Sequence, residues 1–166
     1  MPHRHVRAYL NASIRSTVLC LACATAAGCA APSTSNELLD PASGAMCTNG
    51  QNVRITKSDF SVVLDGACGE VVITASNGSI NVDHARSIRV EGQRVSVLNE
   101  KVDTIDAIGS DNTFNMTEVG HAIVSGDRNT LLGHSYERVT FKGKDNTVNT
   151  DNSPNLDDQG SGNKVI

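Results

Sequence analysis

A short repeat, about 17 residues long, constrains the fold of this chain more than any other feature. Four segments with the pattern Gly-x-x-Asn, each followed by Thr or Lys and then an apolar residue, begin at Gly109, Gly126, Gly143 and Gly160. Further steps of the same length toward the N-terminus reach Gly92 and Ala75. A unit this short cannot bury its own apolar side chains, so neighbouring repeats have to stack and share one core.

Apolar residues recur at fixed offsets from each of these glycine positions. The residues four and two positions before it are apolar in most repeats, which is the alternation of a short strand. No helical periodicity persists across the repeats. The position five residues after it holds Ile80, Val97, Phe114, Leu131, Val148 and Val165. The sequence therefore predicts an all-β fold, a short parallel β-helix or β-solenoid with about six coils of about 17 residues, each about 4.8 Å from the next. The absence of Trp and the 3% aromatic content fit a narrow core.

Two polar columns accompany the apolar ones. A hydroxyl column holds Ser79, Ser96, Thr113, Thr130 and Thr147, and an asparagine column holds Asn112, Asn129, Asn146 and Asn163. Asparagine accepts the left-handed backbone of a sharp corner, and stacked amides can bond to one another, so a structural role explains the asparagines. The alternative is a ligand surface. The candidate binding face for it consists of Asn112, Thr113, Asn129, Thr130, Asn146 and Thr147.

The N-terminal residues have the pattern of a bacterial export signal. A basic segment is followed by a short apolar run from Thr17 to Gly28, which is too short to span a membrane. The run Ala26-Ala27-Gly28 before Cys29 is similar to a lipobox, and a plain secretory signal is the alternative. We expect a signal peptide at residues 1–28, a lipidated tether at 29–46 and a solenoid domain at 47–166. Ala30 after the lipidated Cys29 favours anchoring in the outer membrane.

Two cysteines, Cys47 and Cys68, remain in the mature chain. In an oxidising compartment such a pair predicts a disulfide, which would staple the first end of the solenoid. Zinc is the alternative, but no Cys-x-x-Cys spacing and no nearby histidine support it. The other end carries Asp157 and Asp158, and Asp158 falls in an apolar column where a charge would stop further strand addition.

The Gly-Ser-Asp-Asn-Thr turn at Gly109, the Gly-Lys-Asp-Asn-Thr turn at Gly143 and the cysteine pair resemble the bacterial lipoprotein family catalogued as domain of unknown function 3060. The resemblance extends over about residues 47–150. The early coils depart from the pattern, because Val95 stands where the turn at Gly92 should have Asn. The family has no assigned activity, so the resemblance implies a fold and a location only.

Residue content excludes several functions. Without the three arginines of residues 1–28, 18 acidic residues face 11 basic ones, which disfavours nucleic acid as a partner. His84, His121 and His134 stand in no catalytic motif, and Arg128 separates Asp111 from Asp145. No nonapeptide of the calcium-binding β-rolls is present, and the double threonine row of ice-binding solenoids is also missing.

We therefore expect no catalytic residues, no metal and no cofactor. The predicted function is a non-catalytic interaction or structural module of the cell envelope, anchored in the membrane by a lipid and contacting an envelope protein or a glycan. The alternative is a glycan-binding or carbohydrate-active solenoid, although Tyr136, the one tyrosine of the mature chain, falls in an apolar column rather than on a surface.

Overall fold

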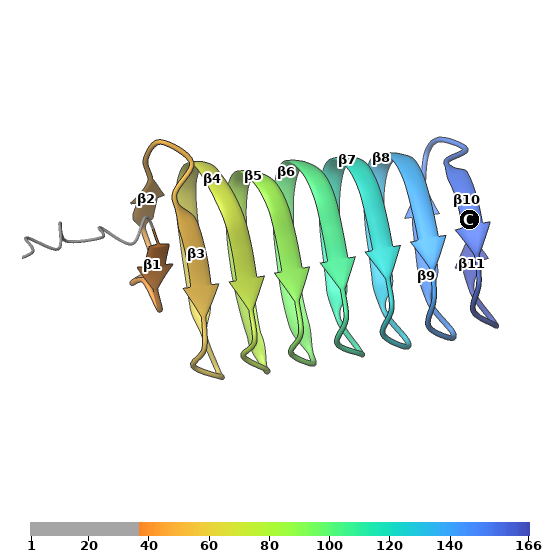
Figure 1. Cartoon of the computed structure of the whole chain (residues 1–166), viewed down its shortest axis with the longest axis horizontal. Helices are drawn as coiled ribbons and strands as arrows, with labels where there is room; N and C mark the ends of the chain where they lie inside the picture. The colour runs from red at the N-terminus through yellow and green to blue at the C-terminus, as the bar shows by residue number, and fades with distance from the viewer. Residues whose placement is uncertain (1–36) are drawn as a thin grey trace, which may run out of the picture. The chain divides into compact units, whose positions relative to one another are not determined.

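Residues 37–166 form a parallel β-solenoid of about eight turns in the computed structural model (Figure 1). These are the residues that the structure describes. The predicted signal peptide at 1–28, the lipidated Cys29 and the first part of the tether lie outside them. Residues 37–166 contain no helix, so none of them forms a helical membrane span.

Eleven strands belong to one continuous parallel sheet. Three short strands open the solenoid, five long strands form its body, and three short strands close it. They are β1 (Glu37–Leu39), β2 (Ala45–Cys47), β3 (Asn52–Ile55), β4 (Ser61–Ile73), β5 (Gly78–Val90), β6 (Val95–Ala107), β7 (Thr113–Val124), β8 (Thr130–Phe141), β9 (Thr147–Thr150), β10 (Asn155–Asp158) and β11 (Lys164–Val165).

Each long strand curves over an arch and so contributes to two sides of the solenoid. In β7, inward and outward residues alternate up to Met116, and two exposed residues, Thr117 and Glu118, then interrupt the alternation. The arches lie at the top of Figure 1 and the tight turns between coils at the bottom. The first halves of the strands therefore face one way, and the second halves face the other.

The register confirms the repeat inferred from the sequence. From β5 to β9 each residue lies beside its equivalent in the next repeat, as in the pairs Val97–Phe114 and Thr113–Thr130. Inward residues of all coils form one core, in which Phe114, Tyr136 and Phe141 are fully buried. The Tyr136 hydroxyl donates to the Leu132 carbonyl at 3.1 Å, and burial raises the pKa of this phenol.

The solenoid begins earlier and has more coils than predicted. Leu38 lies beside Val53, and Val53 lies beside Val71. β1 and β3 therefore add coils to the N-terminal end of the stack, before β4. The domain therefore starts at Glu37 rather than at residue 47, and the last part of the predicted tether belongs to the sheet. The count of about six coils is corrected to about eight turns, because the first coils do not keep the constant spacing of the repeat.

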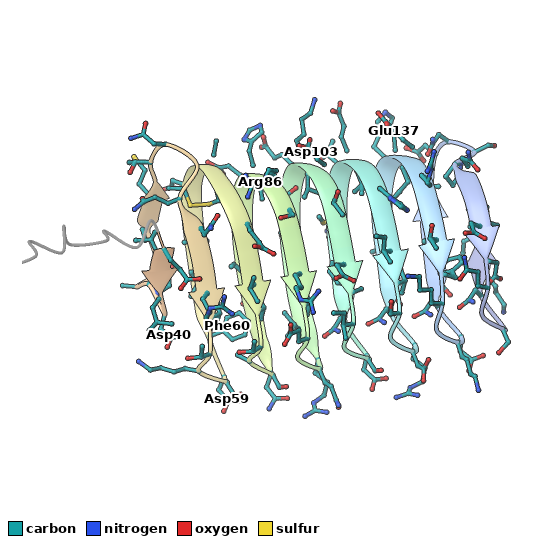
Figure 2. The ribbon with its side chains drawn as sticks, in the orientation of Figure 1. Asp40, Asp59, Phe60, Arg86, Asp103 and Glu137 are labelled. Carbon is teal, nitrogen blue, oxygen red and sulfur yellow. A yellow bond between two sulfur atoms is a disulfide. The ribbon has the colours of Figure 1, made fainter. Side chains whose placement is uncertain are left out.

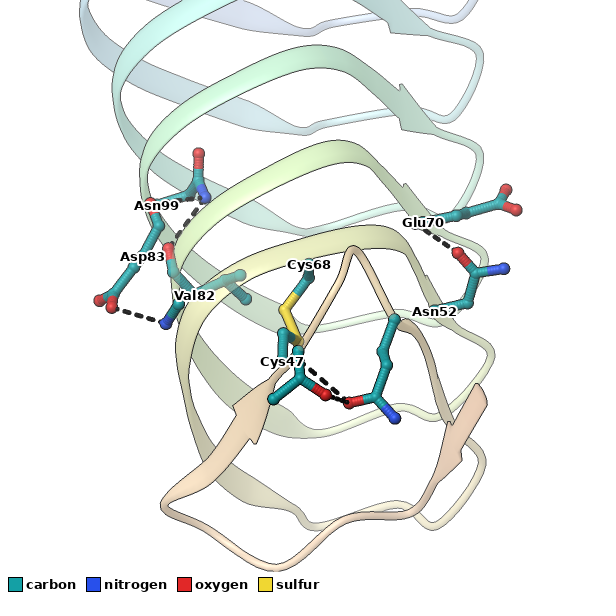
Figure 3. Close-up of a disulfide and its surroundings, with 10 residues drawn as sticks. Cys47, Asn52, Cys68, Glu70, Val82, Asp83 and Asn99 are labelled. Carbon is teal, nitrogen blue, oxygen red and sulfur yellow. Dashed lines mark hydrogen bonds between the residues drawn. A yellow bond between two sulfur atoms is a disulfide. The ribbon is translucent and has the colours of Figure 1, made fainter. Parts of the chain in front are cut away.

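Each end of the stack carries a stabilising contact. The predicted disulfide is confirmed: Cys47 of β2 is bonded to Cys68 of β4 (Figure 3). At the other end Asp158 lies in the last coil and its Oδ1 accepts from the Gly160 amide and from the Asn163 side-chain amide, at 2.9 Å each. These contacts cap an otherwise open turn, as terminal repeats of solenoids must be capped.

Candidate functional site

The asparagine column is buried and serves the scaffold. Asn112, Asn129 and Asn146 are at most 1% exposed. The Asn129 Oδ1 accepts from the Asn112 amide of the preceding coil at 2.9 Å, and its Nδ2 donates to the Gly109 carbonyl at 3.0 Å. The same pair of bonds recurs at Asn112 and Asn146. The three asparagines are therefore removed from the candidate binding face, since no partner in solution can reach them.

The left-handed residue of each turn precedes the asparagine. Asp111, Arg128 and Asp145 have φ of 59°, 54° and 56°, whereas the asparagines that follow them do not have positive φ. Asparagine therefore does not occupy the left-handed position of the turn, and the prediction that it does is wrong. The asparagine is required because one side chain satisfies both an amide and a carbonyl that the turn leaves unpaired.

Charged side chains stack along the turns, with Arg128 between Asp111 and Asp145. Arg128 lies over Asp111 with two hydrogen bonds of 2.8 and 2.9 Å, and these bonds lower the pKa of the Asp111 carboxyl. Arg128 thus takes up both carboxylate oxygens of Asp111 and lies between Asp111 and Asp145. The two aspartates therefore cannot act as a cooperating pair of carboxylates. Exposed pairs of this kind contribute little to stability, because water screens the charges, so their main effect is on register.

The outward residues of the first half of each long strand form a strip that we call the hydroxyl face. Its first column extends the predicted hydroxyl column by one residue, because Ser61 lies beside Ser79. Its second column lies two residues further along each strand. The hydroxyl face consists of Ser61, Ser79, Ser96, Thr113, Thr130 and Thr147 in the first column and Val63, Asn81, Leu98, Asn115, Leu132 and Asn149 in the second.

The twelve side chains of the hydroxyl face are uncharged, and Lys164 continues its first column beside Thr147 in the last coil. Within residues 37–166, the only hydrogen bond that its hydroxyl and amide side chains make is a long one of 3.5 Å between Ser79 and Ser61. Some hydroxyls elsewhere are occupied: the Thr56 hydroxyl bonds to Asp40, and the Thr74 hydroxyl donates to the Ile55 carbonyl. The three threonines predicted for the binding face, Thr113, Thr130 and Thr147, all point outward here.

The opposite side of the solenoid has a different character. Arg89 bonds to Glu91 and to Asp106 at 2.8 and 2.7 Å, and the His121 Nε2 lies 3.0 Å from the Thr140 hydroxyl. Burial lowers the pKa of His121, and Arg138 and Lys142 lower it further by their charge. We call this side, formed by the second halves of the strands, the charged face.

A shallow depression of about 570 Å³ lies where the charged face meets the arches. Asp103 and Glu137, which Figure 2 labels at the arches, line the depression together with Gly120, and His121 and Arg138 line its side. Both carboxylates are exposed, whereas a carboxylic acid that donates a proton near neutral pH is normally shielded from water. The depression therefore lacks the environment of a glycosidase acid, and we assign no catalytic role to it.

The three histidines that the sequence singled out lie apart from one another. The His134 Nδ1 is 2.8 Å from the Asp151 carboxylate on the arch, and His84 lies on the arch three coils earlier. Across residues 37–166 no three His, Cys, Asp or Glu side chains lie close enough together to hold a metal ion.

Fold and surface together define a class of protein: a small parallel β-solenoid, closed by a disulfide at one end, with one charged and one uncharged side. The model of a family described as "Protein of unknown function (DUF3060)" matches residues 108–162. The resemblance predicted from the turns is thus found over these residues, although the match begins later and ends later than expected. No curated protein and no solved structure gave a match.

Proposed function

We propose that this chain is a non-catalytic interaction module of a bacterial cell envelope, and that it binds its partner through the hydroxyl face. One observation carries the proposal: a strip of hydroxyl, amide and aliphatic groups points to solvent with its hydrogen-bonding capacity unused. Free polar groups on an exposed surface normally bind water, so their presence alone proves nothing. Ser87 and Thr104 on the charged face also have free hydroxyls, but they stand among charged residues such as Arg89, Asp106 and Arg138. The hydroxyl face is distinguished by two continuous columns of uncharged side chains.

The scaffold suits such a role because it fixes these groups before a partner arrives. The outward residues are held by β-strands whose register is locked by the buried asparagines beneath the turns. A rigid surface loses little conformational entropy when it binds, so weak contacts can add up to a useful affinity.

We propose further that the module is exported and anchored through a lipid on Cys29, with Ala30 directing it to the outer membrane. The Cys47–Cys68 disulfide supports export, because disulfides persist in oxidising compartments. Residues 30–36 would link the lipid to β1. Radiolabelled palmitate should label the full-length protein but not a Cys29→Ser variant, and the variant should leave the membrane fraction.

The binding surface can be tested by photo-cross-linking in the native cell. A photoreactive phenylalanine analogue at Thr113 or Thr130 should give a cross-linked product of reproducible mass. The same analogue at Thr104, which points outward from the charged face, is the matched control. Products from Thr104 and none from the two threonines of the hydroxyl face would overturn the assignment.

A further inference from the structure

We propose that the hydroxyl face binds an extended, uncharged, β-1,4-linked glycan that runs along the solenoid axis with one sugar ring on each coil. This inference rests on the proposed function and names the ligand of the same surface. The alternative ligands are a folded protein, a second copy of this chain, and a charged polymer.

The second column of the hydroxyl face repeats every two coils. Aliphatic and amide side chains alternate along it without exception from β4 to β9. Val63 and Leu98, which belong to the aliphatic positions, are 40% and 42% exposed. In order along the axis the column reads Val63, Asn81, Leu98, Asn115, Leu132, Asn149. Two coils span about 9.6 Å, twice the strand spacing.

This alternation matches the symmetry of one class of polymer. In an extended β-1,4-linked glycan each sugar is turned over relative to the one before it, so a given edge of the ring recurs at every second sugar. The disaccharide repeat of such a chain is close to the two-coil distance. One set of rings would place C–H groups on the aliphatic side chains, and the other set would place hydroxyl or acetamido groups on Asn81, Asn115 and Asn149.

The first column of the hydroxyl face offers the ligand one hydroxyl group on every coil. Hydroxyls at Ser79, Ser96, Thr113, Thr130 and Thr147 both donate and accept, as do the hydroxyls of a sugar. A hydroxyl face without a charge has no counterpart for an anionic or cationic polymer, whose binding needs charges of the opposite sign.

The dimensions of the strip exclude a large partner. Six coils give a length of about 24 Å, and two columns two residues apart give a width of about 7 Å between side chains. The strip therefore offers an area on the order of 170 Å², whereas a stable interface buries about 800 Å² on each partner. A second copy of the chain or a folded protein would have to extend over the charged turns and arches, while a single polymer chain fits within the strip.

The face has no aromatic platform, so affinity has to arise from many equivalent contacts. Tyr136, the one tyrosine within residues 37–166, is fully buried. Binding should therefore depend strongly on ligand length, because each added sugar occupies one more coil of the same rigid array.

Calorimetry with the full-length protein in detergent tests the inference. The probes are β-1,4-linked N-acetylglucosamine oligomers of two, four and six sugars, with the α-1,4-linked glucose hexamer as a control for linkage. The affinity should rise by about ten-fold or more from the dimer to the hexamer, and the α-linked hexamer should not bind. Equal affinity for both linkages, or no binding of the β-linked hexamer, would overturn the inference.

A pair of exchanges tests the alternation itself. The double variant Asn115→Leu, Leu132→Asn keeps the composition of the face and destroys the two-coil repeat, and should weaken hexamer binding about ten-fold. Leu98→Asn interrupts the repeat at another coil and should act in the same direction. Thr104→Lys on the charged face is the matched control and should bind as the unaltered protein does. Undiminished binding by both altered faces would contradict the proposed contact.

The outcomes separate this inference from the proposed function. Cross-linking from Thr113 without any oligosaccharide binding would rule out the glycan as ligand but would still support the hydroxyl face as the interaction surface. Oligosaccharide binding that is unchanged in Thr113→Lys and Thr130→Lys would show that the ligand does not bind the hydroxyl face, and would overturn both the proposed surface and the inference.

Discussion

Replacing one buried asparagine should remove a large part of the stability of the solenoid. Asn129 is 1% exposed, and its side chain satisfies the Asn112 amide and the Gly109 carbonyl. Asn129→Ala would leave both backbone groups buried without a partner. Each such group costs about 1–3 kcal/mol, so we expect a loss of about 2–6 kcal/mol. The free energy of unfolding of a domain is about 5–15 kcal/mol, so the effect is easy to measure.

Urea unfolding with the disulfide intact, followed by circular dichroism, gives this free energy. Thr113→Ala is the matched control, since its hydroxyl is exposed and has no partner within residues 37–166, and its effect should stay within about 0.5 kcal/mol. Asn163→Ala, at the half-buried end of the column, should fall between the two. A loss at Asn129 no larger than that at Thr113 would refute the role of the ladder.

Asn129→Asp refines the same prediction. The carboxylate keeps the acceptor for the Asn112 amide but faces the Gly109 carbonyl with negative charge. Burial disfavours the charged form in the folded state, so the folded-state pKa of the new carboxyl should lie above its unfolded value. The variant should therefore gain stability relative to the unaltered protein as the pH falls below that raised pKa. Equal instability of Asn129→Asp at neutral and acidic pH would contradict this geometry.

Three further predictions concern the cap, a turn and one histidine. Reduction of the Cys47–Cys68 bond, which joins residues 21 apart, should lower the free energy of unfolding by about 3 kcal/mol; a Cys47→Ala, Cys68→Ala double variant should not respond to reductant. In Gly126→Ala the added Cβ would overlap the Gly109 carbonyl oxygen, so the variant should lose about 1–3 kcal/mol or more; a melting temperature no lower than that of the neighbouring Ser125→Ala would contradict the close approach. Because burial and then Arg138 and Lys142 lower the pKa of His121, its stabilising contribution is complete above about pH 6.5 and is lost as the pH falls through the lowered folded-state pKa. His121→Gln should remove this part of the acid sensitivity in urea unfolding, and an NMR titration midpoint of His121 at or above 6.5 would contradict the shift.

The repeat made the body of the fold predictable from the sequence. From Ala75 onward the register keeps the spacing of the repeat, so each apolar column in the sequence is a layer of the core. The first coils could not be found in this way. Glu37 pairs with Asn52, Val53 with Val71 and Ala45 with Leu64, so the sequence separation changes from one pair to the next. A short proline-containing segment that pairs at irregular spacing has the composition of a linker.

Only part of the candidate binding face could be predicted from the sequence. Strand alternation already contained the signal that separates threonine from asparagine: if Phe114 points inward, Thr113 points outward and Asn112 inward. The asparagines therefore belong to the scaffold and the threonines to the surface. The same alternation places the second column outward, because each of its residues follows the first column by two positions. The sequence could not show that the arch ends this face after the second column.

The most direct test of the central claim is an NMR map of ligand contacts on the isotopically labelled full-length protein. Titration with the β-1,4-linked N-acetylglucosamine hexamer should shift the amide signals of Thr113, Asn115, Thr130 and Leu132, with smaller changes toward the two ends of the hydroxyl face. The amides of Thr104, His121 and Arg138 on the charged face should stay in place. Shifts confined to the charged face or its depression, with none along the hydroxyl face, would contradict the account.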